Sequence, residues 1–179
     1  MAQPPLTISR PELLDGDSDA RFRQLLHRLL AFAGRLEAVR AGLGQRIGLS
    51  GVQYTILICI AHLQGERGVG VKAIADHLGH SGAFVTIEAG KLAEAGLVDK
   101  RPNPADRRRV LLTVTAAGRA RLDALAPSQR PVNDALFASL DRADFERLAA
   151  IAGDLVTDAD DALALLDGFA QPRRRAHSG

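Results

Sequence analysis

The strongest constraint on the fold of this chain is a pair of short helical segments that only a three-residue turn separates. The first segment, Lys72–Leu78, ends at Gly79, a residue that readily adopts the left-handed backbone that closes a helix. Ser81 can cap the second segment, which runs to about Ala95. Two helices joined by so short a turn are typical of a helix-turn-helix.

Two strand-like segments follow these helices directly. Leu97–Arg101 and Arg108–Thr115 flank residues 103–106, a stretch of turn-forming residues. A β-hairpin immediately after a helix-turn-helix is a wing. We therefore predict a mainly α fold with a small β wing, in which a winged helix-turn-helix domain is joined to a dimerisation region of terminal helices.

Two helices are predicted before this segment. From Asp17, which can cap the first helix as Ser18 can, apolar residues recur at three- and four-residue steps. Gly42 and Gly44 are expected to end this helix. The second begins at Ser50, which has capping-box spacing with the glutamine three residues later. Because it is apolar on nearly all sides, we expect it to be buried.

Two more helices are predicted after the wing. Thr115 can cap the helix Ala116–Ala126, which Pro127 and Pro131 are expected to interrupt or kink. Asp141 can cap a last long helix with an apolar stripe. The helices at both ends of the chain have broad apolar faces and little else to cover them, so we expect a second subunit to pack there.

The predicted elements divide the chain into five parts. These are a flexible N-terminal arm over 1–16, a dimerisation helix over 17–48, the winged helix-turn-helix DNA-binding domain over 49–115, dimerisation helices over 116–168 and a basic flexible tail over 169–179.

Positive charge is concentrated in the predicted wing. The net charge of the chain is only +2, but residues 98–121 contain seven lysines and arginines against two aspartates. A further three arginines, Arg173–Arg175, lie near the C-terminus. A polyanion responds to such local concentrations of charge more than to the net charge, so the pattern favours a nucleic-acid partner.

The wing also resembles a known family. Residues 96–108, Gly-Leu-Val-Asp-Lys-Arg-Pro-Asn-Pro-Ala-Asp-Arg-Arg, resemble the wing of the MarR family. They are followed by Val114-Thr115 and Gly118-Arg119, where that family enters its fifth helix. Leu49-Ser50 with Gln53 resembles the start of its second helix. The resemblance covers about Asp17 to Leu166.

The resemblance implies a homodimer held by its terminal helices, with each recognition helix in a major groove and each wing at a minor groove. It implies a sequence-specific repressor of transcription that binds a pseudo-palindromic site in double-stranded DNA and is released by a small ligand, for which an aromatic compound is the candidate. The sequence has no apolar run long enough to span a bilayer and no signal pattern at its N-terminus, so the expected location is the cytoplasm. The resemblance implies no enzyme activity and no cofactor. Two alternatives stay open: a constitutive regulator without a ligand, and a helical small-molecule-binding protein with weakened DNA function.

The candidate DNA contacts lie on both helices of the helix-turn-helix and on the wing. Lysine and arginine neutralise phosphates, serine and threonine bond phosphates or base edges, and a threonine methyl can touch a thymine methyl. Ile87 and Glu88 stand where the family often has an arginine, and Glu88 is expected at the surface or facing the wing. Val85, Ala89 and Leu92 are expected in the core. The candidate contacts are Lys72, Ser81, Ala83, Phe84, Thr86, Lys91, Arg101, Asp106, Arg107, Arg108 and Arg109.

The remaining candidates concern a ligand pocket, a reactive thiol, a zinc site and a catalytic serine. The family has its ligand pocket between the first, second and fifth helices, where the candidate lining residues are His27, Arg35, Tyr54 and Ile58. Cys59 lies in an apolar run and is expected to be buried and unreactive. The histidines lack zinc-site spacing, residues 68–70 indicate only a turn, and the Ser81 region lacks the strand that a catalytic serine requires.

Overall fold

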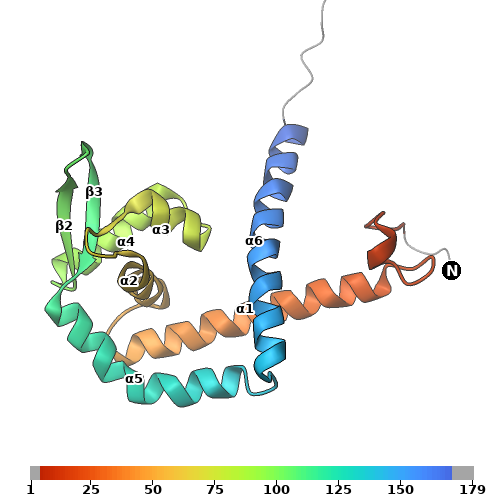
Figure 1. The fold of residues 1–179 in the computed structure, drawn as a ribbon, viewed down its shortest axis with the longest axis horizontal. Coiled ribbons are helices and arrows are strands. Elements are labelled where there is room, and N and C mark those ends of the chain that lie inside the picture. Colours follow the sequence, from red (N-terminus) through yellow and green to blue (C-terminus); the bar gives the residue numbers. More distant parts are fainter. Residues whose placement is uncertain (1–4, 171–179) are drawn as a thin grey trace, which may run out of the picture. The chain divides into compact units, whose positions relative to one another are not determined.

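The computed structural model describes residues 5–170 (Figure 1). Its internal contacts divide the chain into two compact units, Met1–Val132 and Asn133–Gly179. The first unit contains a 3-10 helix and the winged helix-turn-helix, and α6 forms most of the second. The elements in chain order are the 3-10 helix Pro11–Leu13, α1 Ala20–Arg46, α2 Gly51–Leu63, β1 Val69–Gly70, α3 Val71–Leu78, α4 Gly82–Glu94, β2 Val98–Asn103, β3 Asp106–Val114, α5 Ala116–Leu136 and α6 Arg142–Ala170.

The predicted caps of α2, α3 and α4 are confirmed. Ser50 and Gln53 form a complete capping box at the start of α2. Gly79 closes α3 with a left-handed backbone (φ 64°), and the Ser81 hydroxyl accepts a hydrogen bond from the Phe84 N–H at 3.2 Å to begin α4. These local interactions fix the helix-turn-helix where the sequence placed it.

The sheet has three antiparallel strands in the order β1-β3-β2. In the wing, β2 and β3 pair from Val98 with Val114 out to Asn103 with Asp106. The short strand β1, where the sequence indicated only a turn, pairs Val69 with Leu112. Two residues are too few to show strand periodicity, so this strand depends on its partner rather than on a local signal.

The hydrophobic core surrounds α2. Tyr54, Ile56, Leu57 and Ile60 of this helix are essentially inaccessible to solvent, as expected for a helix that is apolar on nearly all sides. Side chains from α3, α4 and the sheet complete the core: Ile74, Ala75, Val85, Ala89, Leu92, Leu97, Val98 and Leu112. The core therefore holds α4 and the wing in one unit.

The ends of α1 differ from the expectation. The helix continues through Gly42 and Gly44 to Arg46, and the left-handed residue that follows it is Gly48 (φ 70°). Gly44 lies inside the helix, and a Cβ at this position would approach the carbonyl oxygen of Ser50 to 2.9 Å. Its glycine therefore allows close packing with the start of α2 instead of ending a helix.

Of the two effects expected of Pro127 and Pro131, an interruption of the fifth helix is wrong, because both lie inside a continuous α5 that reaches Leu136, whereas a kink stays a prediction. Each proline removes one backbone donor, but it leaves the carbonyls and the other N–H groups of the helix in place. Contacts with the first unit also hold α5. Leu125 is buried in the core, and the Arg121 guanidinium donates to the Ile47 carbonyl at 3.2 Å.

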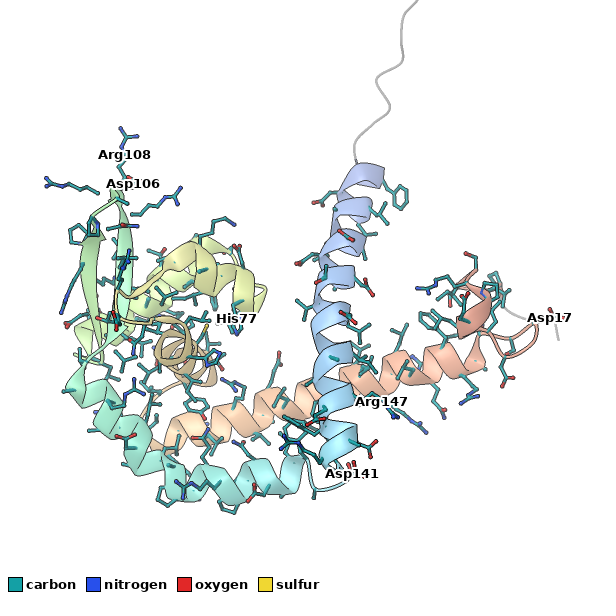
Figure 2. All side chains as sticks on the ribbon, viewed as in Figure 1. Asp17, His77, Asp106, Arg108, Asp141 and Arg147 are labelled. Atoms are coloured by element: carbon teal, nitrogen blue, oxygen red, sulfur yellow. The ribbon has the colours of Figure 1, made fainter. Side chains whose placement is uncertain are left out.

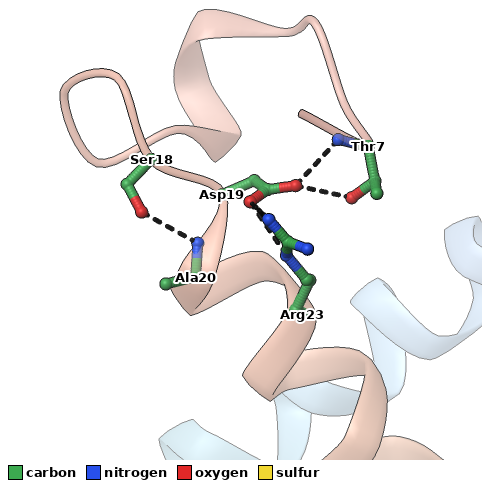
Figure 3. Close-up of polar contacts among 5 residues, drawn as sticks. All are labelled: Thr7, Ser18, Asp19, Ala20 and Arg23. Carbon is green, nitrogen blue, oxygen red and sulfur yellow. Dashed lines mark hydrogen bonds and ion pairs between the residues drawn. The ribbon is translucent and has the colours of Figure 1, made fainter. Parts of the chain in front are cut away.

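The predicted loose arm contains a defined contact to α1 (Figure 3). The Asp19 carboxylate accepts hydrogen bonds from the N–H (2.8 Å) and the hydroxyl (2.6 Å) of Thr7. It also pairs with Arg23 one turn along the helix. These bonds from Thr7, with a smaller contribution from Arg23, lower the pKa of Asp19 to about 2. Asp19, rather than Asp17 or Ser18, occupies the N-cap position.

The helix α6 begins as predicted, with the Asp141 carboxylate accepting from the Asp144 N–H at 2.8 Å. Most of its large apolar side chains are exposed. Among the described residues no single helix is long and apolar enough to cross a bilayer. Only α1 and α2 taken together meet that test, and they meet at a bend of 86°.

Candidate nucleic-acid interface

The first half of α4 presents the candidate contacts of the recognition helix. Ser81, Ala83, Phe84 and Thr86 are all solvent-exposed, while Val85, Ala89 and Leu92 face the core as expected. The Ser81 oxygen caps the helix but its hydrogen remains available to donate. The ring of Phe84 lies edge-on to His80, with centroids 5.0 Å apart.

The recognition helix has an internal ion pair. Glu88 is only 9% exposed, and its carboxylate accepts a hydrogen bond from the Lys91 ammonium at 2.6 Å. The expectation that Glu88 lies at the surface is therefore wrong, because its position borders the inward stripe formed by Val85 and Ala89, and its orientation toward the wing stays a prediction. The pairing neutralises the one lysine of α4, so this helix offers little net charge to phosphates.

Asp106 organises the tip of the wing. One carboxylate oxygen accepts from the Arg108 N–H at 3.1 Å, and the other pairs with Nε of Arg109 at 3.2 Å. Asp106 and Arg108 lie at the end of the hairpin (Figure 2). Arg107 and Arg108 are exposed there, and Arg101 on β2 makes only a long contact (3.7 Å) to Asp99. The tip therefore exposes cations on a turn that the Asp106 carboxylate stabilises through its hydrogen bond to the Arg108 N–H.

A hollow of about 760 Å³ lies where α3, α4 and the sheet meet. Three of its cations are candidate contacts, Lys72, Arg108 and Arg109, and Lys72 also pairs with Asp76 at 2.7 Å. Thr86 brings the recognition helix to the same hollow. Its full lining is Gly70, Val71, Lys72, Ala73, Asp76, Thr86, Ala89, Lys100, Asn103, Arg108, Arg109, Val110, Leu111 and Leu112.

Two residues outside the eleven candidates belong to this surface. Lys100 lines the hollow, and a Cβ on Gly90 would lie 3.5 Å from its ammonium, so Lys100 lies next to α4. Ile87 is 58% exposed on the side of α4 away from the core. Helical periodicity could have predicted that Ile87 is exposed, because position 87 lies opposite the buried row of Val85 and Leu92. The cluster Arg173–Arg175 lies outside the described residues.

The four candidate ligand residues do not meet in one subunit. His27 lines a hollow near the start of α1, beside Asp19 and Arg23. Tyr54 is buried in the core with the guanidinium of Arg40 5.2 Å from its ring centre. Since residues 27 and 40 are about 20 Å apart along a helix, His27 lies far from Tyr54.

The other two residues of this candidate pocket, Arg35 and Ile58, lie on α1 and α2. Arg35 donates to the Ala31 carbonyl of its own helix at 2.8 Å, and Ile58 packs against the core. Cys59 is buried as expected, and this burial raises the pKa of its thiol. Within residues 5–170, no three histidine, cysteine, aspartate or glutamate side chains are grouped as metal ligands.

Comparison with known proteins agrees with this geometry. Residues 47–109, from the end of α1 into the wing, match the family model of the MarR family. Over this segment, about a third of the chain, the sequence is similar to the MarR family. Members of this family among the matching solved structures are transcriptional regulators. No curated protein sequence matches the chain significantly.

Solved structures of MarR-family regulators share the fold. CouR from Rhodococcus jostii RHA1, solved bound to p-coumaroyl-CoA, has a TM-score of 0.68 and 19% identity, covering 78% of this chain and 96% of CouR. A MarR protein from Peptoclostridium difficile DA00132 has a TM-score of 0.67 and 16% identity, covering 86% and 96%. Bordetella bronchiseptica BpsR, whose DNA binding is regulated by 6-hydroxynicotinic acid, has a TM-score of 0.59 and 21% identity, covering 72% and 90%.

Proposed function

We propose that this protein is a MarR-family regulator and acts as a homodimeric, sequence-specific DNA-binding repressor. The observation that carries the proposal is the joining of α4 and the cationic wing through one hollow, which Thr86, Lys100, Arg108 and Arg109 line together. Recognition of a duplex needs both parts: cations that neutralise phosphates and side chains that reach base edges. The proposal assigns no catalytic residues.

Two exposed apolar surfaces support the homodimer. On α1, Leu25, Leu26, Leu29 and Leu30 are exposed, and Leu30 is 70% accessible. On α6, the exposed apolar side chains extend over nearly the whole helix. A soluble regulator does not usually leave surfaces of this size open to water. The α6 set is Phe145, Leu148, Ile151, Leu155, Val156, Leu163, Leu165, Leu166 and Phe169.

The proposal assigns the parts of the chain accordingly. Residues 49–115 bind DNA, while 17–48 and 116–168 form the dimer. Residues 1–16 and 169–179 are outside both functions. This division agrees with the matched segment 47–109, which ends in the wing.

Release by a small ligand is the finer part of the proposal. CouR and BpsR, by their descriptions, bind p-coumaroyl-CoA and respond to 6-hydroxynicotinic acid, and both ligands contain an aromatic ring. A ligand changes DNA affinity only by its preference for one dimer geometry over the other. Because His27 and Tyr54 lie far apart in one subunit, a pocket containing both would require residues from two subunits.

Selection of binding sites from a random DNA pool tests the function. We expect a pseudo-palindrome whose half-sites are centred about one helical turn, roughly 34 Å, apart, because a two-fold dimer presents two α4 helices. Affinity for the selected site should fall steeply with salt. Replacement of Arg107 by Ala should reduce the slope of log affinity against log salt by up to about one.

Three outcomes of this experiment separate the alternatives. A pool with no preferred sequence would contradict specific regulation and favour the small-molecule-binding protein. An asymmetric site would contradict the dimer. A palindrome whose affinity no aromatic acid or thioester changes would leave the constitutive regulator.

A further inference from the structure

The outward face of α4 is apolar in its first two turns. Relative to the buried row of Val85 and Leu92, the positions that point directly away from the core are 83, 87, 90 and 94. Ala83 and Ile87 are exposed, and Gly90 adds no side chain. Ile87 is therefore the largest side chain at the centre of this face. Glu94 lies at the far end of the helix, about 16 Å from Ala83.

The polar groups beside Ile87 are engaged inside the protein. The Thr86 hydroxyl donates to the Gly82 carbonyl at 2.7 Å, which leaves its methyl as the group that faces away from that bond. The Lys91 ammonium is held by Glu88 at 2.6 Å. Hydrogen-bond donors for base edges are therefore scarce in the middle of α4, and the exposed contacts there are methyl and methylene groups.

We propose that α4 recognises thymine through its C5-methyl group, and that Ile87 is the specificity-determining residue. The inference rests on the proposed function and names the chemistry that the recognition helix reads. In the major groove, the thymine methyl is the apolar group among the donors and acceptors of the base edges. An exposed isoleucine can bury that methyl, whereas it cannot bond the acceptors of guanine.

The charges around this face favour DNA over a protein as its occupant. Lys100, Arg108 and Arg109 line the hollow that Thr86 borders, and Arg107 extends the positive surface at the wing. A small apolar face between cations complements thymine methyls between phosphates. A protein partner with an apolar surface would instead have to match these cations with carboxylates.

The test replaces thymine by deoxyuridine, one position at a time, in the site that the random pool yields. Uracil pairs as thymine does but lacks the methyl group. Burying one methyl group strengthens binding about fourfold, so each contacted thymine should give about a fourfold loss of affinity on replacement. Deoxyuridine outside the half-sites should have no effect.

Protein variants then assign the contact. In Ile87→Ala, thymine and uracil should bind almost equally at the sensitive position, because the partner of the methyl is gone. Glu94→Ala is the matched control: Glu94 is exposed at the far end of the same helix, offers no methyl group, and its replacement should retain the fourfold preference for thymine. Ile87 is exposed, so its replacement should leave the melting temperature nearly unchanged.

The outcomes distinguish this inference from the proposed function. A selected palindrome that binds equally well with uracil at every thymine would overturn methyl recognition and leave the regulator intact. The same holds if Ile87→Ala keeps the full preference for thymine. A pool that yields no preferred sequence would overturn both.

Discussion

At the scale of single residues, the proposed DNA binding leads to a prediction for the negative charge at the tip of the wing, Asp106. Its carboxylate holds the Arg108 backbone N–H and the Arg109 side chain together at the tip of the wing. The ion pair to Arg109 is largely exposed and therefore contributes little, about 0–1 kcal/mol. The bond to the backbone is the larger effect, because it fixes the turn from which Arg107 and Arg108 project.

We therefore expect Asp106→Ala to weaken DNA binding about three- to tenfold, although the variant is more positive. Loss of one hydrogen bond of about 0.5–1.5 kcal/mol sets this range. Asp106→Asn keeps an oxygen for the Arg108 N–H and should bind within about threefold of wild type. Titration of both variants against the selected site measures the effect. Tighter binding by Asp106→Ala would show that charge alone determines affinity.

Asp19 gives a second prediction at this scale. Its pKa of about 2 lies below the ordinary value of 3.8, so the contact to Thr7 stabilises the fold fully above pH 4. That stabilisation should be lost as the pH falls from about 4 through 2. The Thr7 amide resonance, followed by NMR, should shift with a midpoint near 2. In Thr7→Val, which lacks the hydroxyl donor, the titration of Asp19 should move toward 3.8; an unchanged midpoint would contradict the contact.

At the scale of helices and strands, one glycine sets how closely α5 packs on the wing. A Cβ on Gly118 would lie 2.3 Å from the Leu97 carbonyl oxygen and 2.8 Å from a Val114 methyl. The Thr115 hydroxyl accepts from the Gly118 N–H at 3.0 Å and donates to the Gly96 carbonyl at 2.7 Å. The start of α5 is thus fixed against both ends of the hairpin.

We expect Gly118→Ala to lower the free energy of unfolding by about 1–3 kcal/mol, because backbone atoms must move to accept the methyl. Gly42→Ala is the control, since nothing lies within 4 Å of its Cβ position in α1. There the change should raise stability by up to about 1 kcal/mol through helix propensity. Urea unfolding of both variants measures the difference. Equal effects at the two positions would contradict the close contact.

Local signals determined how much of these elements the sequence could predict. The boundaries at Ser50, Gly79 and Ser81 were correct, because caps depend on residues three or four positions away. The strand β1 was missed because its pairing with β3 is long-range. The length of α5 was underestimated because packing of Leu125 and neighbouring residues outweighs the cost of two prolines.

The candidate site was predictable to a similar extent. The wing cations could be read from composition, and the outward direction of Ile87 from helical periodicity. The burial of Glu88 could not, because it lies at the border between the inward and outward faces of α4. At such a border, helical periodicity does not determine whether a side chain is buried. The Glu88 side chain is buried, and its carboxylate forms an ion pair with the neighbouring Lys91.

At the scale of the whole molecule, the proposed homodimer would connect DNA recognition to assembly. Exposed apolar side chains lie along both α1 and α6. A second copy of the chain would cover them and present two recognition helices together. Two linked half-site contacts bind more tightly than one because the second forms within the same complex. Dimer formation should therefore determine DNA affinity.

Leu155→Glu in α6 tests this connection. A carboxylate at an apolar position of the proposed interface loses its hydration in the dimer, so the variant should dissociate to monomers. Thr157→Glu adds the same charge on the polar side of α6 and should remain dimeric. Light scattering should give about twice the 19.1 kDa chain mass for wild type and Thr157→Glu, and about the chain mass for Leu155→Glu.

Affinity for the palindrome should fall with the dimer. Leu155→Glu should bind a single half-site as wild type does but lose at least about tenfold in affinity for the full site, because it forfeits the effective concentration of the second contact. Thr157→Glu should bind both sites normally. A wild-type chain that is monomeric at micromolar concentration, or a monomeric Leu155→Glu with full affinity for the palindrome, would contradict the link between assembly and recognition.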